Sequence, residues 1–353
     1  MRRSHDQIET DTLLRDSARE FAREQETAGA AASSSPAGSW QAYVDAGWPG
    51  MALGEDDGGI GADLNQCCLV LQEAGRALLP QSVTADILIA PRLAQYAPQM
   101  AALMPDLIAG AARFALVLPD EAGIRDAEDG RIEGRSQLVP GGDQATHLLL
   151  PAGTGDATRL YLAPSDATGV SVRPARLMDG RGAARYELSG LEPDQLTLLA
   201  SGENARAITG ELEALAICGL LSEGLGAFEA AFEMTVDYVQ IRQQFKQPLA
   251  SFQAVEHIIA DVYCELEKAR SLHMALVGAL EAPGSCDAGA VARARLCHAR
   301  TVLPATGRLI QISGGIALTE DYKLGRIYRR LQTDAALFGG ARRAIDIIAG
   351  AAS

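Results

Sequence analysis

The sequence predicts a mainly α-helical protein with a compact β domain inserted between two helical parts. Helical spacing of apolar residues covers residues 1–112, short apolar runs separated by Gly, Pro and Asp occupy 113–200, and long helical spacing returns over 201–353. Hydrophobic residues make up 48% of the chain but aromatic residues only 5%, and 36 residues are Gly, which suits closely packed helices better than an all-β sandwich. We therefore expect three domains with these boundaries.

The first predicted domain is helical with two interruptions. Apolar residues recur at near-helical spacing from Leu13 to Phe21, and a later helix is expected around Leu69. A small-residue stretch at 28–39 and a Gly-rich run at 54–61 lie between them, and both are typical of loops. The domain should therefore consist of helices joined by irregular connections.

The middle domain should be built from short strands. Its apolar runs are either continuous or alternate with polar residues, and turn-forming residues separate them. Several short strands at this spacing indicate a compact β domain. The runs are 114–118, 148–150, 159–162 and 184–188.

The last predicted domain is a bundle of four long helices. Each helical span is long and the connections between them are short, which is the pattern of a four-helix bundle. Gly and Pro residues fall between the spans, where helices are expected to end. The spans are 212–241, 252–280, 288–312 and 325–348.

Charge and composition argue against several classes of protein. The net charge is −14, the pI is about 4.9 and no basic patch is present, so a nucleic-acid backbone would be repelled. The first residues are polar and no apolar run reaches the roughly 18 residues of a membrane span, so we expect a cytoplasmic protein with no signal peptide or span. Six Cys and five His show neither CxxC nor HxxxH spacing, so we expect no metal site.

One segment carries side chains suited to a dinucleotide. Residues 238–253 read YVQIRQQFKQPLASFQ and lie between the first two predicted bundle helices. Arg242 can bind a pyrophosphate with two parallel hydrogen bonds, the Phe245 ring can cover an adenine or flavin edge, and the Gln253 amide can bind a polar ring edge. The alternative is that Arg242 pairs with a surface carboxylate and Phe245 lies in the core.

A second segment, residues 311–322, reads QISGGIALTEDY. Gly314 and Gly315 would let the backbone pass close to a ligand, because glycine has no Cβ atom. The alternative is a glycine pair that only ends a helix. The distance of this segment downstream of the first one favours a binding role.

In order and spacing, the two segments resemble those of the acyl-CoA dehydrogenase family, Y-x-x-x-R-x-Q-F-x-x-P-L-x-x-F-Q and Q-x-x-G-G-x-G-x-x-x-E-Y. Weaker similarities to the family extend the resemblance over about residues 10 to 350. They lie at 47–61, 73–76 and 178–181, and the last of these resembles a middle-domain turn. It implies an acyl-CoA dehydrogenase fold, with an N-terminal helical domain, a middle β-barrel domain and a C-terminal four-helix bundle.

The resemblance also implies FAD as cofactor. Arg242, Phe245 and Gln253 would contact a FAD held by the neighbouring subunit. Gln311 would contact its adenine end or pyrophosphate, and Gly314 and Gly315 would let the backbone approach it.

The reaction that the resemblance implies is α,β-dehydrogenation of an acyl-CoA thioester. It needs a carboxylate that removes the α-proton, a flavin that accepts the β-hydride, and hydrogen bonds to the thioester carbonyl. The position of the base falls on Asp321, with Glu320 directly before it. Because Asp has a shorter reach, three possibilities stay open: Asp321 as base, Glu320 as base, or a solvated or capping pair. Some relatives carry the base on the first bundle helix, where this chain has Ala216.

Two family motifs are altered in this chain. The flavin-contacting stretch is reduced to residues 118–123 without its Ser-Asp, and the family's E-G-T has become Phe338-Gly339-Gly340. Such losses are similar to those in the small pimeloyl-CoA dehydrogenase subunit and in steroid side-chain dehydrogenase subunits, which pair with a homologous chain as α2β2 heterotetramers. The chain could therefore be a catalytic subunit or a silent partner that completes the FAD pocket of a homologous chain.

The implied partners are an acyl-CoA substrate, an electron-transfer flavoprotein and either identical or homologous subunits. The many Gly and Ala residues permit a bulky acyl group, such as a steroid side chain or another ring-bearing acyl group. A third possibility is an oxidase-type relative, which would form hydrogen peroxide without an added electron acceptor.

Overall fold

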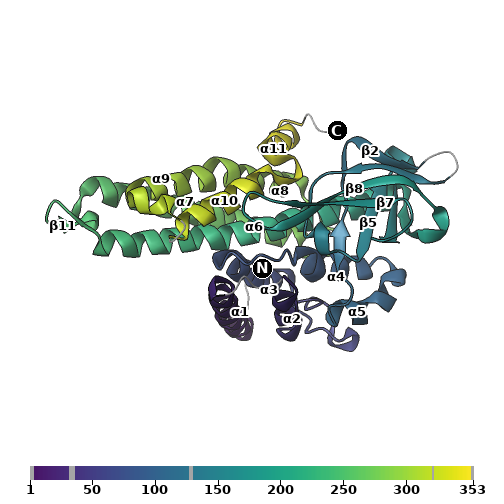
Figure 1. Ribbon diagram of the computed structural model, residues 1–353, viewed down its shortest axis with the longest axis horizontal. Coiled ribbons are helices and arrows are strands. Elements are labelled where there is room, and N and C mark those ends of the chain that lie inside the picture. The colour runs from purple at the N-terminus through teal and green to yellow at the C-terminus, as the bar shows by residue number, and fades with distance from the viewer. Residues whose placement is uncertain (1–3, 32–35, 127–129, 320–321, 351–353) are drawn as a thin grey trace.

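The computed structural model describes residues 4–31, 36–126, 130–319 and 322–350. A long helical bundle and a β domain lie end to end, and the N-terminal helices lie along one side of the junction between them (Figure 1). The order of helical, β and helical parts is the one that the sequence predicts, and the predicted fold class is confirmed.

The N-terminal part is helical, as expected. Asp63 and Gln66 form a capping box at the start of α3, because each side chain accepts a hydrogen bond from the backbone N–H of the other. Nearly all of α3 is buried, so this helix forms the centre of the domain. The helices are α1 (His5–Ala31), α2 (Pro36–Asp45), α3 (Leu64–Arg76), the π-helical turn η2 (Ala85–Ile89), α4 (Ala90–Ala94) and α5 (Met104–Ile108).

Two sheets form the middle part. One has the strand order β1-β5-β6-β9, and the other has the order β2-β3-β8-β4, with β7 also pairing with β8. Apolar side chains from both sheets form one buried cluster between them, around Leu148 and Tyr186. The strands are β1 (Phe114–Leu116), β2 (Pro119–Asp126), β3 (Ile132–Ser136), β4 (Val139–Pro140), β5 (His147–Ala152), β6 (Arg159–Pro164), β7 (Val170–Arg176), β8 (Gly182–Leu191) and β9 (Thr197–Ser201).

The C-terminal bundle differs from the prediction in its last two members. The predicted third helix is two helices joined by a π-helical turn, and the predicted fourth is broken at Phe338, Gly339 and Gly340, which all have positive φ. Left-handed backbone cannot continue an α-helix, so the chain turns there. The elements are α6 (Gly202–Ile241), α7 (Gln253–Leu280), α8 (Ala288–Cys297), η8 (His298–Val302), α9 (Leu303–Ser313), α10 (Leu324–Ala336) and α11 (Gly340–Ile348).

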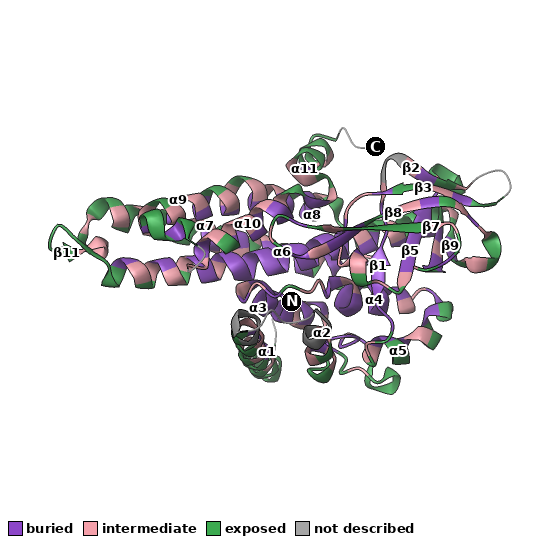
Figure 2. Ribbon diagram, viewed as in Figure 1, coloured by how far each residue is buried: buried purple, intermediate pink, exposed green. Residues whose placement is uncertain are grey.

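Helix α6 is the central element, and it is buried along most of its length (Figure 2). Among the described residues it alone is long and apolar enough to cross a membrane, although the sequence analysis expected no such run. However, 83% of its most apolar window is buried inside the protein, which is typical of a core helix.

Helices α3 and α6 approach each other through glycines. A Cβ atom added to Gly75 would lie 1.9 Å from the Glu223 carbonyl oxygen, and one added to Gly226 would lie 1.8 Å from the Gln72 carbonyl oxygen. Both distances are far below van der Waals contact, so only glycine allows this packing.

We predict that Gly75→Ala lowers the free energy of unfolding by about 3 kcal/mol or more, because α3 must move away from α6. The control is Gly278→Ala in α7, where an added Cβ would have no atom within 4 Å. This control should be neutral or should stabilise the protein by about 0.4–1 kcal/mol, because alanine restricts the unfolded chain. Urea unfolding of the two variants measures the difference, and equal midpoints would contradict the proposed close packing.

Asp86 of η2 joins the N-terminal part to the β domain. Its buried carboxylate accepts a hydrogen bond of 3.0 Å from the backbone N–H of Phe114, and burial raises its pKa to about 6, although Arg113 partly opposes the shift. The folded state therefore keeps a proton that the unfolded chain has already lost above its ordinary pKa of 3.8. The stability that this proton supplies is lost as the pH rises from about 4 to about 6.

We predict that Asp86→Asn removes this pH dependence, because Asn does not ionise but keeps an acceptor for Phe114. Relative to the variant, the wild type should lose about 2.4 kcal/mol of unfolding free energy between pH 4 and pH 7. Urea unfolding of both proteins across this range measures the change. A difference between them that stays constant with pH would show that Asp86 does not titrate as inferred.

Candidate functional site

The first predicted site segment forms a hairpin at the far end of the bundle from the β domain (Figure 1). After α6, the strands β10 (Gln243–Gln244) and β11 (Gln247–Pro248) pair through a two-residue turn, Phe245-Lys246. Both turn residues have positive φ, 52° and 67°. Such turns favour Asn and Gly, and a left-handed non-glycine residue costs roughly 1–2 kcal/mol. Strain of this kind often marks a functional site.

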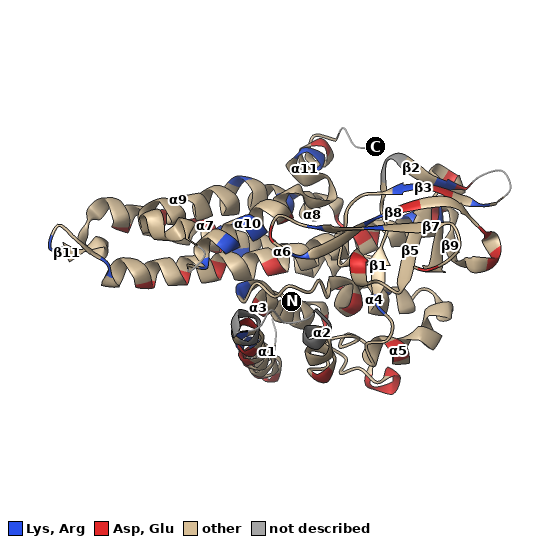
Figure 3. Ribbon diagram, viewed as in Figure 1, with Lys and Arg blue, Asp and Glu red and all other residues tan. Residues whose placement is uncertain are grey.

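The side chains of this hairpin face solvent. Phe245 is 86% exposed, and its ring meets that of Phe252 edge-on, with 6.1 Å between the ring centroids. Arg242 and Gln253 are also exposed, and no carboxylate of the described residues pairs with Arg242. The hairpin carries basic positions and no acidic one (Figure 3). The alternative of a surface ion pair and a core phenylalanine therefore does not hold among the described residues.

The second predicted segment lies at the same end of the bundle. Gln311 is exposed on the last turn of α9, and Gly314 ends that helix with φ 71° and ψ −151°, a conformation that is essentially restricted to glycine. A Cβ atom at Gly314 or Gly315 would meet nothing within 4 Å, so the backbone there is open to a ligand. The six residues predicted to bind the cofactor are thus exposed at one end of the bundle, which we call the bundle tip: Arg242, Phe245, Gln253, Gln311, Gly314 and Gly315.

The residues predicted as catalytic base, Glu320 and Asp321, lie outside the described residues. Their described neighbour Tyr322 donates a hydrogen bond of 3.1 Å to the Met234 carbonyl oxygen, and its ring centroid lies 5.8 Å from that of Tyr238. This contact ties the start of α10 to the last turns of α6. Tyr322 therefore lies near the bundle tip.

A cavity of about 830 Å³ lies at the other end of α10, between that helix and the β domain. The 13 residues of α10 span roughly 20 Å, so Tyr322, just before its start, and this cavity are at opposite ends of one helix. No carboxylate lines the cavity among the described residues, whereas the exposed Arg185 and two amides do. The lining residues are Gln137, Leu138, Leu177, Met178, Arg185, Gln332, Thr333, Ala336, Leu337, Phe338 and Gly339.

Comparison with known proteins gives the family. The model of the acyl-CoA dehydrogenase N-terminal domain matches residues 8–111, and that of the C-terminal domain matches residues 214–352. The chain belongs to the acyl-CoA dehydrogenase family.

Individual relatives agree with this assignment. The acyl-CoA dehydrogenase IpdE2 of Mycobacterium tuberculosis is 29% identical over 296 residues, which cover 84% of this chain and 80% of that protein. The structure of the G363A variant of the steroid ACAD Tcur3481-Tcur3483 is 28% identical with a TM-score of 0.84, and the match covers 98% of this chain and 99% of that one. Butyryl-CoA dehydrogenase of Megasphaera elsdenii, at 18% identity and a TM-score of 0.83 over 99% of both chains, supports the fold alone.

In this dehydrogenase, a buried ion cluster fixes the β domain against the bundle. The Arg181 guanidinium, after β7, lies 2.6 Å from a carboxylate oxygen of Asp179 and 3.2 Å from one of Glu223 in α6. It also pairs with the carboxylate of Asp334 in α10. The Arg330 guanidinium of α10 lies 2.8 Å from a carboxylate oxygen of Asp179 and 2.9 Å from one of Glu223. Burial raises the pKa of Glu223, against the effect of the two guanidiniums. The sequence analysis identified residues 178–181 only as a turn, because the ion-pair partners of Asp179 and Arg181 are distant in the chain.

Ala216, at the alternative base position, lines a second and smaller cavity of about 40 Å³. Within the described part of the chain, the one carboxylate in its wall is that of Glu223, which is 3% exposed and paired with both Arg181 and Arg330. The Glu223 carboxylate accepts hydrogen bonds from both guanidiniums, so it is not free to approach a substrate. Neither cavity therefore presents a free carboxylate among the described residues.

The turn after α10 shapes the wall of the larger cavity. Phe338 and Gly339 have φ of 53° and 81°, and the buried Arg295 of α8 donates a hydrogen bond to the Leu337 carbonyl oxygen. Burial lowers the pKa of Arg295 to about 10. This contact holds the turn where the sequence predicted a continuous helix.

Proposed function

We propose that this acyl-CoA dehydrogenase chain works in an oligomer, where its bundle tip binds the adenine dinucleotide part of a FAD whose flavin lies on a neighbouring chain. One observation carries the proposal: the six predicted cofactor-binding residues are exposed at one end of the bundle, far from the cavity of their own chain. Helix α6 runs on from Glu223, near the cavities, for about 27 Å to its end at Ile241. In this proposal, the bundle tip and the cavity of one chain are therefore too far apart to contact the same dinucleotide.

The residues of the tip fit this part of FAD. The guanidinium of Arg242 can donate two hydrogen bonds to a pyrophosphate, and the exposed ring of Phe245 can cover an adenine. Gln253 and Gln311 offer amides, and the open backbone at Gly314 permits close approach. When bound, FAD supplies the hydride acceptor for the β-carbon of the acyl thioester.

The base of the reaction comes, in this proposal, from a homologous chain, so that this chain is the silent partner of an α2β2 heterotetramer. The support is the cavity wall, in which the described residues offer no carboxylate. Asp321 and Glu320 come directly before Tyr322 in the sequence, and Tyr322 contacts the last turns of α6. The second candidate, a catalytic chain with Asp321 or Glu320 as base, requires one of these carboxylates to reach an α-proton.

The substrate of the assembly is an acyl-CoA, and we infer a ring-bearing acyl group. The support is the 28% identity to the steroid ACAD Tcur3481-Tcur3483 over nearly the whole chain. Electrons then leave through an electron-transfer flavoprotein in the cytoplasm. If the complex instead formed hydrogen peroxide without such an acceptor, it would be an oxidase-type relative.

We predict that Arg242→Ala weakens FAD binding in the complex by 10- to 100-fold, because a charge-assisted hydrogen bond contributes about 1.5–3 kcal/mol. Phe245→Ala should have a smaller effect in the same direction. Flavin content after gel filtration and a FAD titration of the assembled protein measure both effects. The control is Arg300→Ala, which removes an exposed bundle arginine outside the tip and should retain FAD. Equal FAD affinity in all three variants would refute the role of the tip.

We predict that Asp321→Asn and Glu320→Gln change kcat of the assembled complex by less than about twofold. Loss of a true general base costs about 10²- to 10⁴-fold. Stopped-flow reduction of the flavin by the acyl-CoA substrate separates the two cases without depending on the electron acceptor. A loss of a hundredfold or more in either variant would assign the base to this chain.

A further inference from the structure

Three helices bring two thiols and an imidazole together in the core, away from the tip and from the larger cavity. Cys68 lies on α3, Cys218 on α6 and His273 on α7, and the three side chains are 1%, 0% and 6% exposed. The two sulfur atoms are 3.7 Å apart, and all three potential ligand atoms lie within 4.8 Å of one another. Nothing in the proposed function uses these groups.

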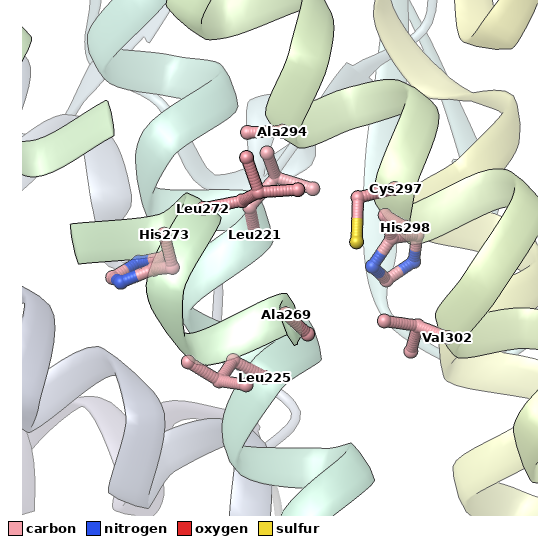
Figure 4. Close-up of a pocket in the computed structure, with 9 residues that line it drawn as sticks. All are labelled: Leu221, Leu225, Ala269, Leu272, His273, Ala294, Cys297, His298 and Val302. Carbon is pink, nitrogen blue, oxygen red and sulfur yellow. The ribbon is translucent and has the colours of Figure 1, made fainter. Parts of the chain in front are cut away.

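A fourth polar group completes the cluster. Ser222 lies one turn after Cys218 on α6, and its hydroxyl is 2.8 Å from His273 Nε2. Figure 4 shows the His273 ring turned away from Cys297 and His298, which lie across the neighbouring pocket. The surroundings are otherwise apolar, with Leu221 and Leu276 among the buried neighbours in the same core. Four polar groups therefore meet in a region that would normally hold apolar side chains.

We propose that Cys68, Cys218 and His273 bind one zinc ion, with the Ser222 hydroxyl as the fourth ligand. Two Zn–S bonds of about 2.3 Å at a tetrahedral angle hold the sulfurs about 3.8 Å apart, close to the distance between Cys68 and Cys218. A disulfide would instead require the sulfurs to be about 2.05 Å apart. The separation of the two sulfur atoms thus suits a shared cation.

Charge balance favours a divalent cation. Two thiolates neutralise Zn²⁺, and a neutral imidazole and a hydroxyl add no charge, so the core would hold no net charge. The thiolate is the form that binds metals. Zinc binding would therefore displace the thiol protons of Cys68 and Cys218.

The site would be structural, because protein groups fill all four positions and bulk water is excluded. It would join α3 of the N-terminal domain to α6 and α7 of the bundle, at an interface that also depends on Gly75 and Gly226. The proposal is independent of FAD binding, and its test needs no measurement of enzyme activity.

The test is the metal content of the full chain purified from cells grown with zinc and without chelators. We expect about one zinc per chain by plasma mass spectrometry, and a thiolate-to-metal charge-transfer band after replacement by Co²⁺. Cys68→Ser should retain at most a tenth of the metal and lose the band. The control is Cys67→Ser, which alters a buried thiol one residue away that lies outside the cluster.

Two results would overturn the proposal. One is wild-type protein that contains no zinc and gives no Co²⁺ band, and the other is equal metal content in wild type and Cys68→Ser. The second result would assign any metal to the exposed thiols Cys264 and Cys286. If Cys68→Ser does not fold, the wild-type Co²⁺ spectrum and a rise in Tm on adding Zn²⁺ to the apo-protein still decide the question.

Discussion

The arrangement of the molecule depends on five charged side chains buried where the β domain meets the bundle. Two guanidiniums, Arg181 and Arg330, are shared among three carboxylates from the β7–β8 turn, α6 and α10. The apolar contact beside them is small, with Leu177 and Leu337 among its four buried members. Removal of one partner from such a pair leaves a buried charge without compensation and costs about 3–5 kcal/mol. The walls of the larger cavity are therefore held in place by ionic contacts more than by apolar packing.

This constraint also separates the two functional regions of the chain. The ion cluster fixes the end of α10 that forms the cavity, whereas the contact between Tyr322 and Tyr238 fixes the other end at the bundle tip. The two regions therefore lie at opposite ends of α10. In the proposed function, a dinucleotide that contacts both kinds of surface lies between two chains.

The sequence predicts those parts of the site that are contiguous along the chain. Arg242, Phe245 and Gln253 fall within sixteen residues, so their spacing alone places them on one turn and its following helix. The ion cluster joins Asp179 to Asp334, and the thiol cluster joins α3, α6 and α7. No local spacing marks such sets, because only the packing of distant helices brings them together. The break after α10 was also missed, because Phe338 and two glycines permit a turn without requiring one.

The conformation of the hairpin gives independent reason to see the tip as a binding surface. A two-residue turn with positive φ folds most readily with Asn or Gly, yet here it contains Phe245 and Lys246. The ring of Phe245 is left in water, where burial would have contributed about 1.5–3 kcal/mol. Within the isolated chain, both features oppose stability. They become favourable only when a partner covers the ring and meets the cationic side chains, and an aromatic base joined to a pyrophosphate can do both.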